Sequence, residues 1–62
     1  MKLKLRAKRV EKNYTQAELA KALGVAVATY NRYENGYYEM TESIINKLLT
    51  ILECKYEDIF LD

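Results

Sequence analysis

Residues 15–36 read TQAELAKALGVAVATYNRYENG, and this stretch contains two short helix patterns separated by a glycine. It opens with a capping box, in which the Thr15 hydroxyl and the Glu18 carboxylate each satisfy a free backbone amide at the start of a helix. Gly24 ends that helix, because glycine adopts the left-handed backbone conformation at low cost. The sequence therefore predicts a helix over residues 16–23 that begins and ends at defined positions.

A second helix is predicted directly after this turn, over residues 27–34. Tyr30 and Tyr33 are three residues apart, which puts both on one face of the helix. Asn35 and Gly36 then form a strong stop signal. Two short helices joined by a tight turn present the second helix to the major groove of DNA in helix-turn-helix proteins.

The segments on either side also have helical patterns, since the chain has no proline and only two glycines. We expect a helix over residues 2–12 that ends at Asn13, and a short closing helix over residues 56–60. Thr41 caps a further helix. The apolar side chains of that helix recur at i, i+3, i+4 and i+7: Ile45, Leu48, Leu49 and Leu52. The predicted fold class is all-α, a compact five-helix bundle that contains a helix-turn-helix.

The 62 residues form one predicted domain, residues 1–62, with the helix-turn-helix proper at 16–35. A core of this size supplies about 3–5 kcal/mol, so we expect no walled catalytic cleft and no enzyme activity. The chain has no histidine and a single cysteine, Cys54, which excludes the usual zinc sites and an internal disulfide. No apolar run approaches the roughly 20 residues that span a bilayer. We expect a cytoplasmic protein with no cofactor, metal, membrane contact or small-molecule ligand.

Charge is divided unevenly along the chain although the net charge is only +1. Residues 1–12 carry six Lys or Arg and one Glu, whereas residues 39–62 carry six acids and two lysines. A basic end can face phosphates while an acidic end faces away. Two solvated helix surfaces would explain the same division equally well.

The motifs resemble those of the Cro and phage-repressor type of helix-turn-helix proteins. The resemblance rests on residues 15–20 (TQAELA), 23–25 (LGV) and 32–36 (RYENG), and it covers roughly residues 5–60. It implies a domain like that of the phage lambda repressor, usually dimeric on a two-fold operator. It also implies a transcriptional regulator of a prokaryote or a phage.

The resemblance places base contacts at the start and on the outer face of the helix over residues 27–34. The positions are Val27, Ala28, Asn31 and Arg32. Arg32 can donate two parallel hydrogen bonds to guanine, and Asn31 can contact adenine or hold a phosphate. Val27 and Ala28 can make only apolar contact, for example with a thymine methyl group. Ordinary solvated helix surface is the alternative for each position, or an ion pair in the case of Arg32.

The resemblance also implies phosphate contacts around the same helix, at Gln16, Thr29, Asn35, Gly36 and Tyr37. Gln16 lies at a helix N-terminus, where the free amides and the helix dipole favour an anion. Asn35 and Gly36 also end the helix, so their residue types have a structural explanation as well. Glu39 follows closely and would repel a phosphate.

Arg9 and Glu34 occupy positions similar to those of a family ion pair that ties the first helix to the end of the third. We interpret this pair as structural, because loss of one partner strands the other. The remaining basic residues of the first segment are expected to attract DNA without sequence preference. They are Lys2, Lys4, Arg6, Lys8 and Lys12.

The first functional hypothesis is a sequence-specific regulator that binds double-stranded DNA as a homodimer and acts as a repressor or phage-type switch. Tyr56, Ile59, Phe60 or Leu61 can supply the dimer contact, or they can close the core. The alternative hypothesis is a protein-interaction module, such as an antitoxin or adaptor, built on the same scaffold. DNA binding weakens steeply with salt whereas apolar protein contacts do not, and this difference separates the two hypotheses.

Overall fold

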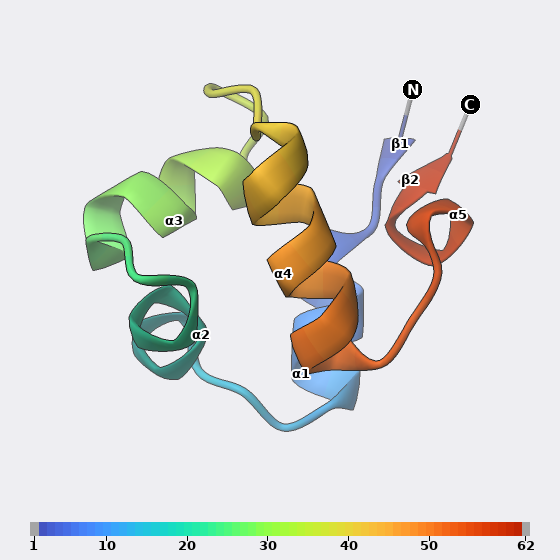
Figure 1. Cartoon of the computed structure of the whole chain (residues 1–62), viewed down its shortest axis with the longest axis horizontal. Helices are drawn as coiled ribbons and strands as arrows, with labels where there is room; N and C mark the ends of the chain where they lie inside the picture. The colour runs from blue at the N-terminus through green and yellow to red at the C-terminus, as the bar shows by residue number, and fades with distance from the viewer. Residues whose placement is uncertain (1, 62) are drawn as a thin grey trace.

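The computed structural model describes residues 2–61 and contains five α-helices and two short strands (Figure 1). The helices are α1 (Leu5–Glu11), α2 (Gln16–Leu23), α3 (Val27–Glu34), α4 (Glu42–Leu52) and α5 (Tyr56–Ile59). The strands β1 (Lys2–Leu3) and β2 (Phe60–Leu61) pair antiparallel, with Leu3 opposite Phe60. The predicted five-helix fold is confirmed, and a small two-stranded sheet joins the two ends of the chain.

Both helices of the helix-turn-helix begin and end where the sequence predicts. The Thr15 hydroxyl accepts a hydrogen bond from the Glu18 amide at 3.0 Å, and the Glu18 carboxylate accepts one from the Thr15 amide at 2.9 Å. The bond from the backbone lowers the pKa of Glu18, because it favours the charged carboxylate. Gly24 has a φ of 77°, and no atom lies within 4 Å of the position of an added Cβ. Backbone conformation alone therefore accounts for glycine at this turn.

The sequence prediction was wrong at both ends of the chain. The helix expected over residues 2–12 begins only at Leu5, because β1 precedes it and pairs with β2. The last helix ends at Ile59 for the same reason, and Phe60 belongs to β2. A hydrogen bond of 2.7 Å from the Lys4 amide to the Ile59 carbonyl continues the connection between the two ends. Strands of two residues have no alternating pattern, so sequence periodicity cannot detect them.

The core consists of fully buried side chains contributed by all five helices. They are Leu5, Leu19, Ala20, Leu23, Tyr30, Leu48, Leu52 and Ile59. Ile59 therefore closes the core and is not available for a dimer contact. Cys54 is partly buried against this core, and the burial raises the pKa of its thiol. Among the described residues, no helix is long and apolar enough to cross a membrane.

Within residues 2–61, two residues other than glycine adopt the left-handed backbone conformation, and each follows a helix. Asn13 has a φ of 65°, as expected for the residue that ends the first helix. Glu53 ends α4 with a φ of 51°. Because this conformation costs a side-chain-bearing residue about 1–2 kcal/mol, Glu53 introduces local strain.

A largely buried ion pair connects α1 to the end of α3. Arg9 Nε donates to Glu34 Oε2 at 2.8 Å, and Arg9 Nη1 donates to the Tyr14 carbonyl at 2.7 Å. The Arg9 and Glu34 side chains are 11% and 3% exposed. The hydrogen bond with Glu34 raises the pKa of Arg9. The Tyr30 hydroxyl is buried nearby without a hydrogen-bond partner among the described residues, and burial raises its pKa.

We expect Arg9→Ala to lower the free energy of unfolding by about 3–5 kcal/mol, because the Glu34 carboxylate would remain buried without its partner. Urea denaturation followed by circular dichroism measures this change. The matched control is Lys8→Ala, which removes an ion pair between Lys8 and Glu11 at the protein surface. This control should change stability little. Equal losses in the two variants would contradict a structural role for the Arg9–Glu34 pair.

Candidate nucleic-acid interface

A shallow hollow of ≈ 530 Å³ lies along the outer face of α3. Its lining comes from the start of α2, from α3 and from the loop that follows α3. The lining residues are Gln16, Val27, Ala28, Asn31, Arg32 and Tyr37. All of them belong to the set of base and phosphate contacts expected from the sequence. The fold thus brings together residues that are up to 21 positions apart, from Gln16 to Tyr37.

The base-contact candidates are accessible on this face. Ala28, Asn31 and Arg32 are exposed, and Val27 is 47% exposed. Tyr30 is the one buried residue of α3. Tyr30 and the partly buried Tyr33 attach α3 to the core, and Glu34 is held by Arg9, so the opposite face of the helix is the part that is free to meet a ligand.

The phosphate-contact candidates divide into two groups. Gln16 and Tyr37 line the hollow, and Tyr37 is 77% exposed. Asn35 and Gly36 are exposed just beyond the end of α3, whereas Thr29 is partly buried and lies outside the lining. Gly36 has a φ of 76°, so its conformation favours glycine with or without a ligand.

Arg32 rests on an aromatic side chain. Its guanidinium carbon lies 5.5 Å from the centre of the Tyr38 ring, and it forms no ion pair within the described part of the chain. Tyr38 in turn packs edge-on against Tyr33, with ring centres 6.4 Å apart and planes at 70°. The sequence did not predict this contact of Tyr38 with Arg32. Its contact depends on the course of the loop after α3, for which the sequence gives no signal.

Three side-chain amides form a hydrogen-bonded row across the same face. Asn35 Nδ2 donates to Asn31 Oδ1 at 3.1 Å and to the Asn31 carbonyl at 3.0 Å. Asn31 Nδ2 donates to Gln16 Oε1 at 3.3 Å. The spacing of Asn31 and Asn35 is that of neighbours on a helix surface, but the link to Gln16 joins two helices and has no local signal.

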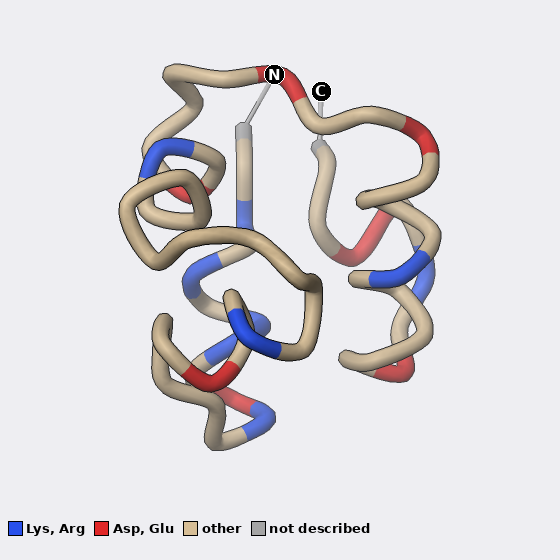
Figure 2. Tube along the Cα trace, turned by 60° about the vertical axis from the view of Figure 1, so that its left-hand side comes forward, with Lys and Arg blue, Asp and Glu red and all other residues tan. Residues whose placement is uncertain are grey.

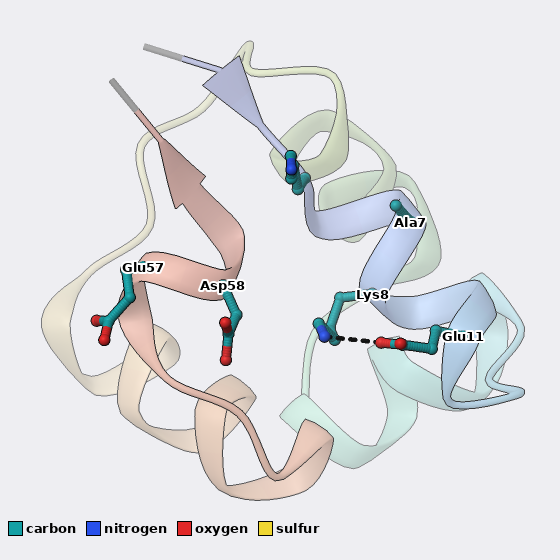
Figure 3. Close-up of a pocket in the computed structure, with 6 residues that line it drawn as sticks. Ala7, Lys8, Glu11, Glu57 and Asp58 are labelled. Atoms are coloured by element: carbon teal, nitrogen blue, oxygen red, sulfur yellow. Dashed lines mark ion pairs between the residues drawn. The ribbon is translucent and has the colours of Figure 1, made fainter.

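The basic residues of the first segment do not all face this surface. Lys8 Nζ lies 2.7 Å from Glu11 Oε2, and this hydrogen bond raises the pKa of Lys8 and lowers that of Glu11. Figure 3 shows the pair on α1, facing Glu57 and Asp58 of α5 across a hollow that is separate from the one along α3. Lys8 is therefore engaged with acidic neighbours.

Acidic positions are distributed over several sides of the molecule (Figure 2). The division of charge along the sequence therefore does not produce a single acidic end in space. The side chain of Lys2, another of the expected basic residues, lies outside the described residues. Arg32 is the basic residue within the lining of the α3 hollow.

A third hollow, of ≈ 380 Å³ and with a mainly apolar lining, lies beside the small sheet and the loop after α3. Its lining combines Leu3, Ile45, Tyr56 and Phe60 with Tyr33 of α3 and with Gly36, Tyr38, Glu39 and Met40 of the loop after α3. The rings of Tyr56 and Phe60 are stacked with centres 4.5 Å apart, and Tyr56 is 49% exposed. Figure 1 shows α5 and both strands on the side of the molecule opposite α2 and α3.

The fold and the α3 surface define a helix-turn-helix protein, and comparison with known families gives the same result. A helix-turn-helix family model, of the Cro and phage-repressor type, matches residues 5–59. The chain belongs to this family. Its members are DNA-binding transcriptional regulators and are not enzymes.

Two archaeal proteins are similar to the chain over almost their whole length. A protein from Methanocaldococcus jannaschii is 39% identical over 61 residues, which cover 98% of this chain and 92% of the relative. A protein from Archaeoglobus fulgidus is 34% identical over 61 residues, which cover 98% and 86% respectively. Both relatives are named as uncharacterised helix-turn-helix transcriptional regulators.

We expect the contact between Arg32 and Tyr38 to contribute a coupling free energy of about 0.5–1 kcal/mol, as exposed cation–π pairs do. A double-mutant cycle with Arg32→Gln and Tyr38→Leu measures this energy by urea denaturation. Tyr38→Phe is the control, because it keeps the aromatic face and should keep the coupling. Additive effects of Arg32→Gln and Tyr38→Leu would show that the contact does not hold in solution.

Proposed function

We propose that the protein is a sequence-specific DNA-binding regulator that places α3 in the major groove of a two-fold operator. The observation that carries this proposal is the hollow along α3, which gathers polar and apolar contact residues on one exposed face. An α-helix about 10–12 Å wide fits the major groove, which is about 12 Å wide. Family membership supports the same function.

We assign direct contact with bases to four residues of α3, which differ in how well their side chains can distinguish base pairs. Arg32 is proposed to bind guanine through O6 and N7, and Asn31 to contact adenine. Val27 and Ala28 are proposed to pack on thymine methyl groups. Because two of the four contacts are apolar, most of the discrimination between base pairs rests on Arg32 and Asn31.

Phosphate contacts are assigned to residues on both sides of the recognition helix. They are Gln16, Thr29, Asn35, Gly36 and Tyr37. None of these positions carries a charge, and Glu39 lies in the same loop as Asn35, Gly36 and Tyr37. These five contacts therefore add little electrostatic attraction, which favours binding by two protomers together.

A homodimer formed through the α5 side of the molecule fits the spacing of two adjacent half-sites. Half-sites one helical turn apart lie about 34–36 Å from each other, so each α3 must lie about 17 Å from the two-fold axis. One protomer is 27 Å long, and α3 and α5 lie toward opposite sides of it (Figure 1). Tyr56 and Phe60 are the proposed contact residues, whereas Ile59 is buried in the core. The side chain of Leu61 lies outside the described residues.

A dimer that occupies an operator can act as a repressor or a phage-type switch, since occupancy alone excludes other proteins from the same DNA. The second candidate is an interaction module, such as an antitoxin or adaptor. The apolar hollow beside Tyr56 and Phe60 favours it, because that surface can also hold another protein. Selection on DNA distinguishes the two candidates.

We expect the purified protein to enrich a two-fold motif from a random duplex library, with half-sites about one helical turn apart. Arg32→Ala should lose one preferred guanine, at a cost of about 1–3 kcal/mol. The affinity for the selected site should fall log-linearly with salt concentration. A folded protein that enriches no motif would exclude autonomous sequence recognition and favour the interaction module.

We expect Tyr56→Glu to convert the proposed dimer into a monomer, because a charge at the interface would be buried without a partner. Sedimentation velocity should give twice the chain mass of 7.3 kDa for the unmodified protein and the single-chain mass for the variant. Val10→Glu is the matched control, because Val10 is 56% exposed on α1, away from the lining of the hollow beside the sheet. The same mass for Tyr56→Glu and the unmodified protein would rule out this interface.

A further inference from the structure

The hollow beside the small sheet is lined by four aromatic side chains from different parts of the fold. Tyr33 of α3 and Tyr38 of the following loop form an edge-on pair, with ring centres 6.4 Å apart. Tyr56 of α5 and Phe60 of β2 form a stacked pair, with ring centres 4.5 Å apart. Its volume of ≈ 380 Å³ lies in the range of small-molecule sites, about 300–1,000 Å³. The other lining residues are Leu3, Gly36, Met40 and Ile45, together with one acidic residue, Glu39.

Both the aromatic and the acidic groups of this lining favour a positive charge. The faces of aromatic rings carry the negative part of their charge distribution. Glu39 is the only charged residue in the lining, and it is exposed and forms no ion pair within residues 2–61. The hollow therefore attracts cations and repels anions.

One of the four rings already has a cation beside it. The guanidinium carbon of Arg32 lies 5.5 Å from the centre of the Tyr38 ring, within the roughly 6 Å over which cation–π attraction acts. Arg32 lines the hollow along α3 and not the hollow beside the sheet. The lining beside the sheet thus combines aromatic rings and a carboxylate with no basic residue of the chain itself.

The lining also limits the kind of cation that fits. A primary ammonium group has three N–H donors and is strongly hydrated, so an apolar lining would leave most of its hydrogen bonds unmade. A quaternary ammonium group has no N–H donor and presents only alkyl groups to its surroundings. Aromatic rings recognise such groups without any hydrogen bond.

We propose that the hollow beside the small sheet binds a small organic cation of the quaternary ammonium class. Four aromatic rings contact the cation, and the Glu39 carboxylate balances its charge. This site goes beyond the proposed DNA binding and does not depend on it. It departs from the sequence-based expectation of no small-molecule ligand, because only the fold brings the four rings together.

The test compares choline with its neutral isostere 3,3-dimethylbutan-1-ol, in which a carbon atom replaces the quaternary nitrogen. Choline chloride should shift the backbone amide NMR signals of the lining residues and reach saturation, whereas sodium chloride at equal ionic strength should not. The isostere should bind about 5- to 30-fold more weakly, as the loss of two exposed cation–π contacts predicts. Equal affinity for the two compounds, or no saturable shift with choline, would overturn the proposal.

Variants test which groups of the lining bind the cation. Glu39→Gln should weaken choline binding about 2- to 5-fold. Glu57→Gln is its matched control, because it removes the same charge from an exposed residue that lines the separate hollow between α1 and α5. Tyr56→Leu should also weaken binding about 2- to 5-fold, and Tyr56→Phe, which keeps the ring, should not. Choline affinity that is unchanged in both Glu39→Gln and Tyr56→Leu would place the cation elsewhere and overturn the proposal.

A further measurement separates this site from the proposed dimer, whose contact also uses Tyr56 and Phe60. Choline and a second copy of the chain would compete for these rings, so sedimentation velocity should give a larger single-chain fraction in choline chloride than in sodium chloride. This competition rests on the proposed function, whereas choline binding does not. A dimer that binds no choline would overturn the cation site and leave the dimer intact. A protein that binds choline but remains a single chain at every concentration, or a dimer fraction that choline does not change, would rule out the proposed dimer contact and leave the cation site intact.

Discussion

The buried contact between Arg9 and Glu34 is the constraint on which the position of the candidate DNA-binding surface depends. One guanidinium group bonds the carboxylate at the end of α3 and the carbonyl of Tyr14, just before α2. It therefore fixes α1 against both ends of the helix-turn-helix. Because α3 contributes one fully buried residue and the partly buried Tyr33 to the core, this polar contact adds a further attachment at the end of α3, where the following loop begins. Arg32, Asn35 and the loop after α3 take their places from it.

The rest of the structure leaves the outer face of α3 free. Ala20 is fully buried in α2 next to α3, and its small side chain lets the two helices approach closely. Tyr30 and the partly buried Tyr33 supply the apolar contact of α3 with the core, and no side chain caps the start of this helix. The exposed positions of α3 therefore carry little of the stability of the fold. Their residue types can be explained by what they contact outside the chain, rather than by packing within it.

Local chemistry made α2 and α3 predictable, and non-local contacts were not predictable. Thr15, Glu18 and Gly24 set the bounds of α2 through bonds between near neighbours, so sequence alone gave those bounds. The pairing of β1 with β2 joins residues at opposite ends of the chain, and it shortened both terminal helices. The candidate contact residues on and around α3 were predicted from a family resemblance. Their partners, such as Tyr38 beneath Arg32, depend on side-chain conformations across different elements.

The side chains that contact Arg32 and Asn31 affect how well so small a surface could distinguish DNA sequences. With few proposed phosphate contacts and two proposed apolar base contacts, the protein would have little binding energy to lose on ordering its side chains. An arginine carries up to about 2 kcal/mol of rotamer entropy, and part of this is lost when it binds a base. Tyr38 holds the Arg32 guanidinium, and Gln16 and Asn35 hold Asn31, before any DNA is present. Ordering in advance reduces the entropy lost on binding, so each of the two proposed polar contacts would retain more of its free energy for discrimination.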